Sequence, residues 1–153
     1  MTAIPPLLHA HTIHHATHWS GAHYLVTLTY DDRFLRRKVL TTATGERFLV
    51  DLPQTTSLNH GDAFELTDGR LIEVIAAEED LLEITAENLT RIAWHIGNRH
   101  TPCQIEPTRL LIQHDHVIRD MLEKLGADVR DVSEPFTPEG GAYGHGRTHS
   151  HAH

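Results

Sequence analysis

Residues 81–100 read LLEITAENLTRIAWHIGNRH, and this stretch decides how the second half of the chain folds. Leu81 to Thr85 is a short apolar run that favours a β-strand. From Glu87 onward, apolar residues recur at the spacing of a helix with one buried face, and Gly97 is placed to end that helix. The stretch therefore predicts a strand followed by an amphipathic helix.

The residues after this helix predict a second round of the same elements. Residues 103–106 and 109–113 are short extended runs, and residues 129–132 form a last strand. Between them, Asp115 can cap a helix that Gly126 closes. The predicted order β-α-β-β-α-β is that of a ferredoxin-like domain.

The residues before residue 77 predict a different module. Alternation of apolar and polar residues begins at Tyr24, several short strands follow, and Asp68-Gly69 marks the clearest hairpin. The predicted fold class is therefore α+β. Its parts are a small all-β N-terminal domain over residues 1–76, of which 1–22 are His-rich and irregular, a ferredoxin-like domain over residues 77–135, and a flexible Gly/His-rich tail over residues 136–153.

The overall composition excludes several classes of protein. The chain has 153 residues, 39% hydrophobic and 22% charged, which is typical of a soluble globular protein with one domain or two small ones. Lys and Arg total 13 against 21 for Asp and Glu, and a net charge of −8 disfavours nucleic acid and anionic membranes as partners. No apolar run approaches the roughly 20 residues of a membrane span. We expect no signal peptide, and the single Cys103 fits a cytoplasmic protein without an intrachain disulfide.

Histidine is the unusual feature of the composition, with 15 residues of 153. Neutral imidazole is the commonest side-chain ligand for borderline divalent metals. Because the chain has many imidazoles and only one thiol, it points to nickel or zinc rather than to Cu(I) or iron–sulfur chemistry. The histidines form an N-terminal cluster (His9, His11, His14, His15, His18, His23), a single His60, a central group (His95, His100, His114, His116) and a C-terminal group (His145, His149, His151, His153).

The central histidines are candidate metal ligands. His100 follows the predicted helix end, and two copies related by a dimer axis would supply half of a four- or six-ligand shell; the alternative is an exposed loop histidine. In His114-Asp115-His116 the imidazoles stand two residues apart and can converge in extended backbone, unless Asp115 simply caps a helix between two polar neighbours. His95 flanks the apolar stripe of its helix, where a surface or boundary role is expected.

The C-terminal histidines stand at near-alternate positions in a Gly-rich segment. Such tracts bind borderline metals readily and weakly, because each site must order a flexible backbone. A purification tag is the alternative, and the irregular spacing argues against it. The single Cys103 is expected to be a small buried hydrophobe, and the alternative is a soft metal ligand.

Three motifs resemble the UreE family of urease accessory proteins: WHIGNRH at residues 94–100, HDHV at 114–117 and EPFTPEGGAY at 134–143. The resemblance extends over residues 23–153. It implies a homodimeric nickel metallochaperone, with a β-rich N-terminal domain and a ferredoxin-like metal-binding domain.

The same resemblance implies roles for particular residues and partners. His100 of each protomer would form the interface site, completed by the tail histidines His145, His149, His151 and His153. His114 and His116 would be peripheral or transfer sites, and His95 would matter less. The implied partners are the accessory GTPase UreG and the complex of urease apoprotein with its accessory proteins.

Three functions are therefore compared. The first is a chaperone that delivers Ni(II) and has no catalysis of its own, with Zn(II) or Cu(II) able to bind in vitro. The second is a metal-dependent hydrolase built on His114-Asp115-His116, which is disfavoured because the candidate ligands lie on a loop, a helix start and a flexible tail, without a His-Glu-x-x-His motif. The third is a nickel or zinc store, or a zinc-responsive interaction protein, with no delivery role.

Overall fold

The computed structural model describes residues 7–140, and the chain divides into two units, each with its own hydrophobic core. The boundary falls between Ala76 and Ala77. The fold is of mixed α+β type, in which strands dominate and both α-helices of the described part belong to the second unit. Neither helix is long and apolar enough to pass through a bilayer.

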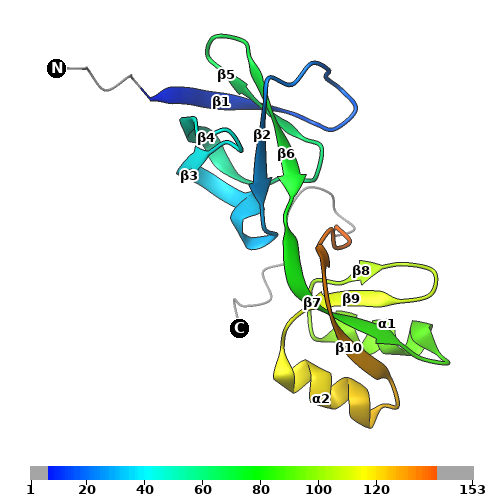
Figure 1. The fold of residues 1–153 in the computed structure, drawn as a ribbon. Coiled ribbons are helices and arrows are strands. Elements are labelled where there is room, and N and C mark those ends of the chain that lie inside the picture. Colours follow the sequence, from blue (N-terminus) through cyan, green and yellow to red (C-terminus); the bar gives the residue numbers. More distant parts are fainter. Residues whose placement is uncertain (1–6, 141–153) are drawn as a thin grey trace. The chain divides into compact units, whose positions relative to one another are not determined.

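The first unit is built on a six-stranded sheet with the order β2-β6-β5-β1-β4-β3. Strand β1 is paired on both sides, parallel to β4 and antiparallel to β5 (Figure 1). Alternate side chains of β4 and β6, such as Phe48, Val50, Ile72 and Val74, are fully buried in the core. The elements are β1 (Leu8–His14), β2 (Tyr24–Leu28), a short 3₁₀ turn (Asp31–Arg33), β3 (Phe34–Thr41), β4 (Arg47–Ser57), β5 (Ala63–Leu66) and β6 (Leu71–Ala76).

Strand β1 corrects one expectation, because residues 1–22 were predicted to be irregular. Ala10 is fully buried, and the partly buried Ile13 packs against the same core. The pairing of β1 with β5 shifts register between Ala10 and Thr12. This irregularity places the two core-facing residues three positions apart rather than two, so the alternation typical of a strand is broken in the sequence.

The hairpin predicted at Asp68-Gly69 is confirmed, since β5 and β6 pair antiparallel across it. Gly69 has a φ of 89°, a left-handed conformation that favours glycine. The Asp68 carboxylate accepts a hydrogen bond of 3.0 Å from the backbone N–H of Arg70. This bond and the adjacent guanidinium of Arg70 hold the pKa of Asp68 below its usual value.

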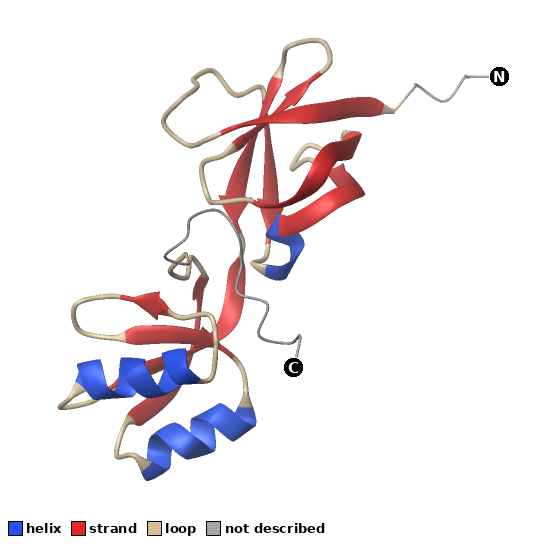
Figure 2. Cartoon of the chain, turned by 180° about the vertical axis from the view of Figure 1, so that it is seen from behind, coloured by secondary structure: helices blue, strands red, loops and turns tan. Residues whose placement is uncertain are grey.

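The second unit has a four-stranded antiparallel sheet with the order β10-β7-β9-β8. Both helices cover the same face of this sheet (Figure 2). Ile92 and Ile96 of the first helix, and Ile118 and Leu122 of the second, are buried in a core shared with the sheet residues. The elements follow in the order β7 (Glu78–Thr85), α1 (Leu89–Asn98), β8 (Gln104–Ile105), β9 (Leu110–Gln113), α2 (His116–Lys124) and β10 (Asp128–Pro135).

The packed chain extends beyond β10, whereas a flexible tail was expected from residue 136. Phe136 is fully buried. The backbone N–H of Thr137 donates to the side-chain oxygen of Gln104, and that of Glu139 donates to the carbonyl of Cys103, both at 2.9 Å. Burial of Phe136 and two hydrogen bonds from backbone N–H groups therefore hold this segment. The Pro and Gly residues of the segment are typical of a flexible linker, so the sequence did not indicate that it is packed.

Candidate metal centre

His100 occupies an unusual backbone position at the end of α1. Its φ is +58°, and its N–H donates to the carbonyl of Gly97 at 2.9 Å, while the N–H of Thr101 donates to the carbonyl of Ile96 at 3.4 Å. These two bonds form a Schellman motif, in which the left-handed position is most often glycine. The prediction that Gly97 ends the helix is therefore wrong: Gly97 lies within α1, and His100 takes the left-handed position three residues later.

The backbone position of His100 fixes the root of an exposed side chain. A left-handed conformation is unfavourable for a residue with a Cβ, and residues held in such conformations cluster at functional sites. The preceding turn of α1 carries another of the central histidines, His95, which is half-buried. The His95 ring meets that of Trp94 edge-on at 5.1 Å, and Trp94 is 63% exposed.

The motif His114-Asp115-His116 spans the passage from β9 into α2. The capping role predicted for Asp115 is confirmed, because its carboxylate accepts the N–H groups of Val117 and Ile118 at 2.9 and 3.1 Å. Its two neighbours are exposed, and both line an open depression together with Leu82, Asp115 and Arg119.

The two histidines differ in their polar contacts. The Nε2 atom of His114 lies 2.9 Å from a carboxylate oxygen of Asp131 on β10. The same oxygen lies 3.5 Å from the guanidinium of Arg119. His116 is the first residue of α2. The two imidazoles therefore lie beside the ion pair of Arg119 with Asp131, in an open depression. This arrangement suits weak binding of a metal ion better than it suits an enclosed catalytic metal site.

Residues 7–140 of one chain contain no group of three or more His, Cys, Asp or Glu side chains placed to hold a metal ion. The described part of the chain therefore does not assemble His95, His100, His114 and His116 into one centre. The other predicted ligands, His145, His149, His151 and His153, lie outside the described residues. A tight site requires additional ligands beyond those that the described part of one chain brings together.

Cys103 packs partly buried against the core of the second unit. Burial, with a smaller contribution from the charge of Glu139, raises the pKa of its thiol to about 12. The thiol is therefore protonated at neutral pH, and a protonated thiol is a poor metal ligand. This supports the expectation that Cys103 acts as a small hydrophobe.

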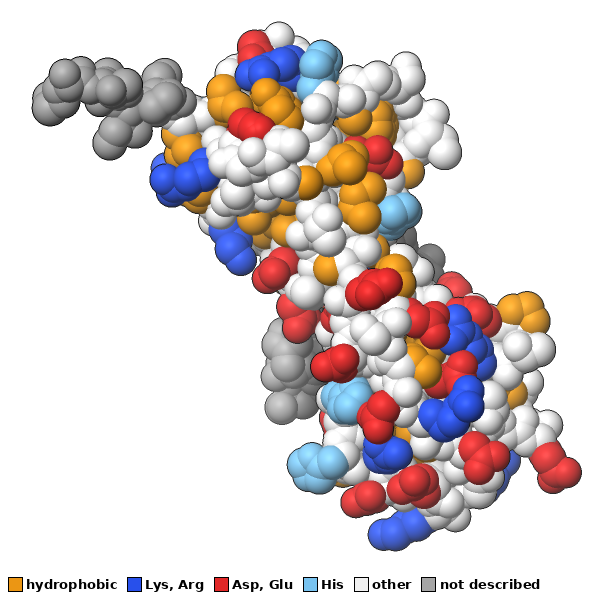
Figure 3. Space-filling model, in the orientation of Figure 1, with side chains coloured by type: hydrophobic (Ala, Val, Ile, Leu, Met, Phe, Trp, Pro, Cys, Tyr) orange, Lys and Arg blue, Asp and Glu red, His pale blue; other side chains and the backbone are white. Residues whose placement is uncertain are grey.

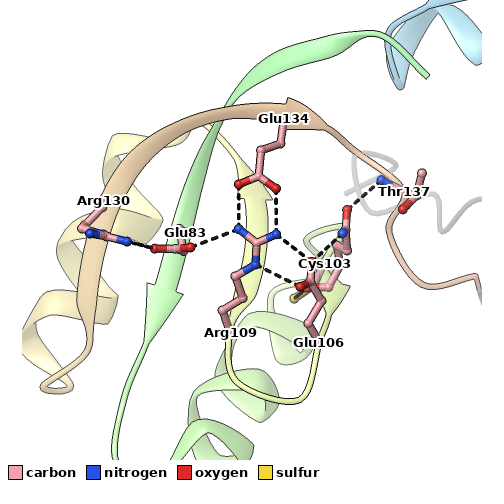
Figure 4. Close-up of polar contacts among 8 residues, drawn as sticks. Glu83, Cys103, Glu106, Arg109, Arg130, Glu134 and Thr137 are labelled. Atoms are coloured by element: carbon pink, nitrogen blue, oxygen red, sulfur yellow. Dashed lines mark hydrogen bonds and ion pairs between the residues drawn. The ribbon is translucent and has the colours of Figure 1, made fainter. Parts of the chain in front are cut away.

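A charged cluster around Arg109, which sequence reasoning missed, fastens the end of β10 to the rest of the second unit (Figure 4). The guanidinium binds both carboxylate oxygens of Glu134, at 2.6 and 2.7 Å. It also donates to Glu83 at 3.0 Å and to Glu106 at 3.0 and 3.1 Å. Glu106 lies only three residues from Arg109, but Glu83 and Glu134 are far from it in the sequence, and no local spacing marks these two as its neighbours.

The charges of the Arg109 cluster shift the pKa values of its carboxyl groups. Hydrogen bonds from Arg130 and Arg109 hold the pKa of Glu83 below its usual value, and Arg109 does the same for Glu134. The cluster holds Glu134, and the separate hydrogen bond from Glu139 to Cys103 keeps the end of this segment beside the loop that follows His100. Elsewhere on the second unit, acidic and basic side chains are interspersed over the face seen in Figure 3.

Comparison with known proteins assigns the chain to a family. The model for the N-terminal domain of the UreE urease accessory protein matches residues 4–77, and the model for its C-terminal domain matches residues 79–153. The chain belongs to the UreE family. The resemblance inferred from the motifs of UreE proteins is thereby confirmed.

Several relatives of the family resemble the chain over most of its length, and all carry the name urease accessory protein UreE. The protein of Ruegeria pomeroyi is 74% identical over 136 residues, which cover 89% of this chain and 91% of the relative. The protein of Ruegeria sp. strain TM1040 is 64% identical, covering 94% and 82%. That of Cereibacter sphaeroides is 61% identical, covering 88% and 74%.

Proposed function

We propose that the chain serves urease maturation as a nickel-binding chaperone without catalysis of its own. As a homodimer, it collects Ni(II) in the cytoplasm and passes it to the accessory GTPase UreG within the complex of urease apoprotein and accessory proteins. Membership of the UreE family supports the role in urease maturation. The large number of imidazoles supports nickel as the cargo.

The observation that carries this proposal is the placement of His100. Its imidazole is exposed, and its backbone is held in a left-handed conformation by the bonds that end α1. Because residues 7–140 provide no three-ligand group, this anchored imidazole needs partners from elsewhere. A second copy of His100 across a two-fold axis supplies one such partner in the same orientation.

The C-terminal histidines supply the remaining ligands in this proposal. Glu139 is fastened to Cys103, and His145 follows six residues later. Six residues span at most roughly 20 Å, and Cys103 lies within roughly 10 Å of chain from His100, so the segment is long enough to bring a tail imidazole to His100 of its own chain. Ligands on such a segment can dissociate one at a time, which lets the ion be released to a partner.

The other histidines have lesser roles in the proposed pathway. His114 and His116 act as peripheral or transfer ligands at the depression beside α2, and His95 is a ligand of lesser importance. Storage of nickel or zinc without delivery is the second candidate function. The His-rich composition is compatible with it, since weak imidazole sites also buffer metal ions.

A transfer experiment distinguishes delivery from storage. The full chain is loaded with radioactive nickel and mixed with the accessory GTPase, GTP and urease apoprotein complex, and urease activity is recorded with the location of the label. We expect transfer and activation, both strongly reduced in His100→Ala and retained in His18→Ala, which removes an exposed histidine of the first unit. Nickel that stays on the chain while urease remains inactive would favour storage.

A further inference from the structure

The first unit carries a pair of histidines that the proposed function does not use. His9 and His11 lie on strand β1, on either side of the fully buried Ala10, and both are exposed. Because both imidazoles are exposed while Ala10 between them is buried in the core, both lie on the side of β1 that faces away from that core. Their ring centres are 6.0 Å apart, with planes inclined by 47°.

The spacing of the two rings suits a shared metal ion. A divalent ion binds imidazole nitrogen at about 2.0–2.1 Å, which places each ring centre roughly 3.2 Å from the ion. Two such rings are therefore roughly 4.5 Å apart when the ligands are at right angles and roughly 6.4 Å apart when they are opposite. The observed 6.0 Å lies within this range, so small side-chain rotations are sufficient.

A hydrogen bond prepares His11 as a ligand. Its Nδ1 atom lies 3.0 Å from the backbone carbonyl of Asp51 on β4. A carbonyl oxygen only accepts, so Nδ1 carries the proton and the neutral ring keeps the lone pair of Nε2 free for a metal. Metal-binding histidines usually have such a partner on their second nitrogen, which fixes the tautomer and the ring orientation.

Among the described residues, no third His, Cys, Asp or Glu side chain is placed to complete the pair. The carboxylate of Asp51 faces Arg37 at 3.6 Å, and His14 binds Glu65 at 2.6 Å through its Nε2 atom. Between the two histidines, Ala10 pairs with Val50 of β4 and with Leu66 of β5, which holds the backbone that carries both imidazoles. The site is therefore prearranged and open, with its other positions left to water.

We propose that His9 and His11 form a second metal site, distinct from His100, that binds Cu(II), Ni(II) or Zn(II) weakly and exchanges it rapidly. Two imidazoles without a thiolate select borderline divalent ions, and Cu(II) should bind most tightly among them. The net charge of −8 favours the approach of cations in general. Such a site collects metal ions at the surface of the first unit.

Paramagnetic Cu(II) provides the test, because it broadens the NMR signals of nearby amides. Metal-free full chain labelled with ¹⁵N is titrated in the His100→Ala background, so that the site is followed without the central ligand. We expect selective loss of the amide signals of residues 9–11, of their partners Leu49 and Val50 on β4, and of Asp51, whose carbonyl lies beside His11. His9→Gln and His11→Gln should each weaken this effect by at least about tenfold, since each removes one of two protein ligands.

His18→Gln is the matched control, because it removes an exposed histidine of the same unit. The three substituted side chains are exposed, and unchanged dispersion of the remaining amide signals verifies the fold. Broadening that spares residues 9–11, or that is the same in the His9→Gln and His18→Gln variants, would overturn the proposal.

Discussion

Replacing His100 by glycine should stabilise the metal-free protein while weakening its binding of nickel. The φ of His100 is +58°, and the residue ends α1 in the position where glycine is most common. Histidine is less favourable for folding than glycine at this position. The strained backbone thus indicates that the imidazole is retained for another purpose.

The size of the effect follows from two opposing contributions. A left-handed conformation costs a residue with a Cβ roughly 1–2 kcal/mol, and glycine avoids this cost. Glycine in turn loses more backbone freedom on folding, which lowers the gain by about 0.5–1 kcal/mol. His100→Gly should therefore raise the free energy of unfolding by about 0.5–1 kcal/mol.

Urea unfolding of the metal-free full chain, in the presence of a chelator, measures this difference. His100→Ala is the matched control, because it also removes the imidazole but keeps a Cβ in the left-handed region. We expect the glycine variant to exceed the alanine variant by about 1 kcal/mol, and both to lose tight nickel binding. If glycine were no more stable than alanine, His100 would not be strained and the reasoning would fail.

Three further predictions concern the second unit. Arg109→Met should lower the free energy of unfolding, measured by urea denaturation, by about 2 kcal/mol, because it leaves Glu83 paired with Arg130 alone. This value lies between those typical of exposed and of buried ion pairs. The pKa values of Glu83 and Glu134 are lowered in the folded protein, so the stability that these carboxylates contribute is present above about pH 4.5 and is lost as the pH falls through their folded-state pKa values. The stability of Arg109→Met should therefore fall less in acid than that of the parent protein. With a thiol pKa of about 12, Cys103 should resist alkylation by iodoacetamide at pH 8 in the native state and react on denaturation; rapid native labelling would contradict its burial. Asp115→Ala should cost about 1 kcal/mol of stability by removing the cap of α2, with Asp115→Asn nearly neutral, and equal losses in both variants would refute the capping role.

Much of the fold could be predicted because local signals agree with it. Asp115 caps α2 through its own carboxylate, and Asp68-Gly69 makes a hairpin turn, so each can be recognised within a few residues. The end of α1 was predicted wrongly for a related reason. Gly97 is the expected residue for a helix end, whereas the structure places His100 in that conformation, against its intrinsic preference.

The features that escaped prediction depend on contacts between distant residues. Strand β1 forms because β4 and β5 pair with it, and an irregular register hides its alternation. Phe136 and the Arg109 cluster hold a Pro- and Gly-containing segment that resembles a linker by composition. The candidate ligands could be identified from residue type, but their separation within the described part of the chain could not, because histidine spacing does not determine which side chains meet.

Calorimetric titration of the metal-free full chain with nickel, with the molecular mass determined in the same buffer, tests the central claim most directly. The proposed function predicts a dimer with one tight step at one nickel per two chains. That step should be absent in His100→Ala and retained in His18→Ala. A monomer, or a tight step that survives in His100→Ala, would contradict a nickel site shared between two copies of His100.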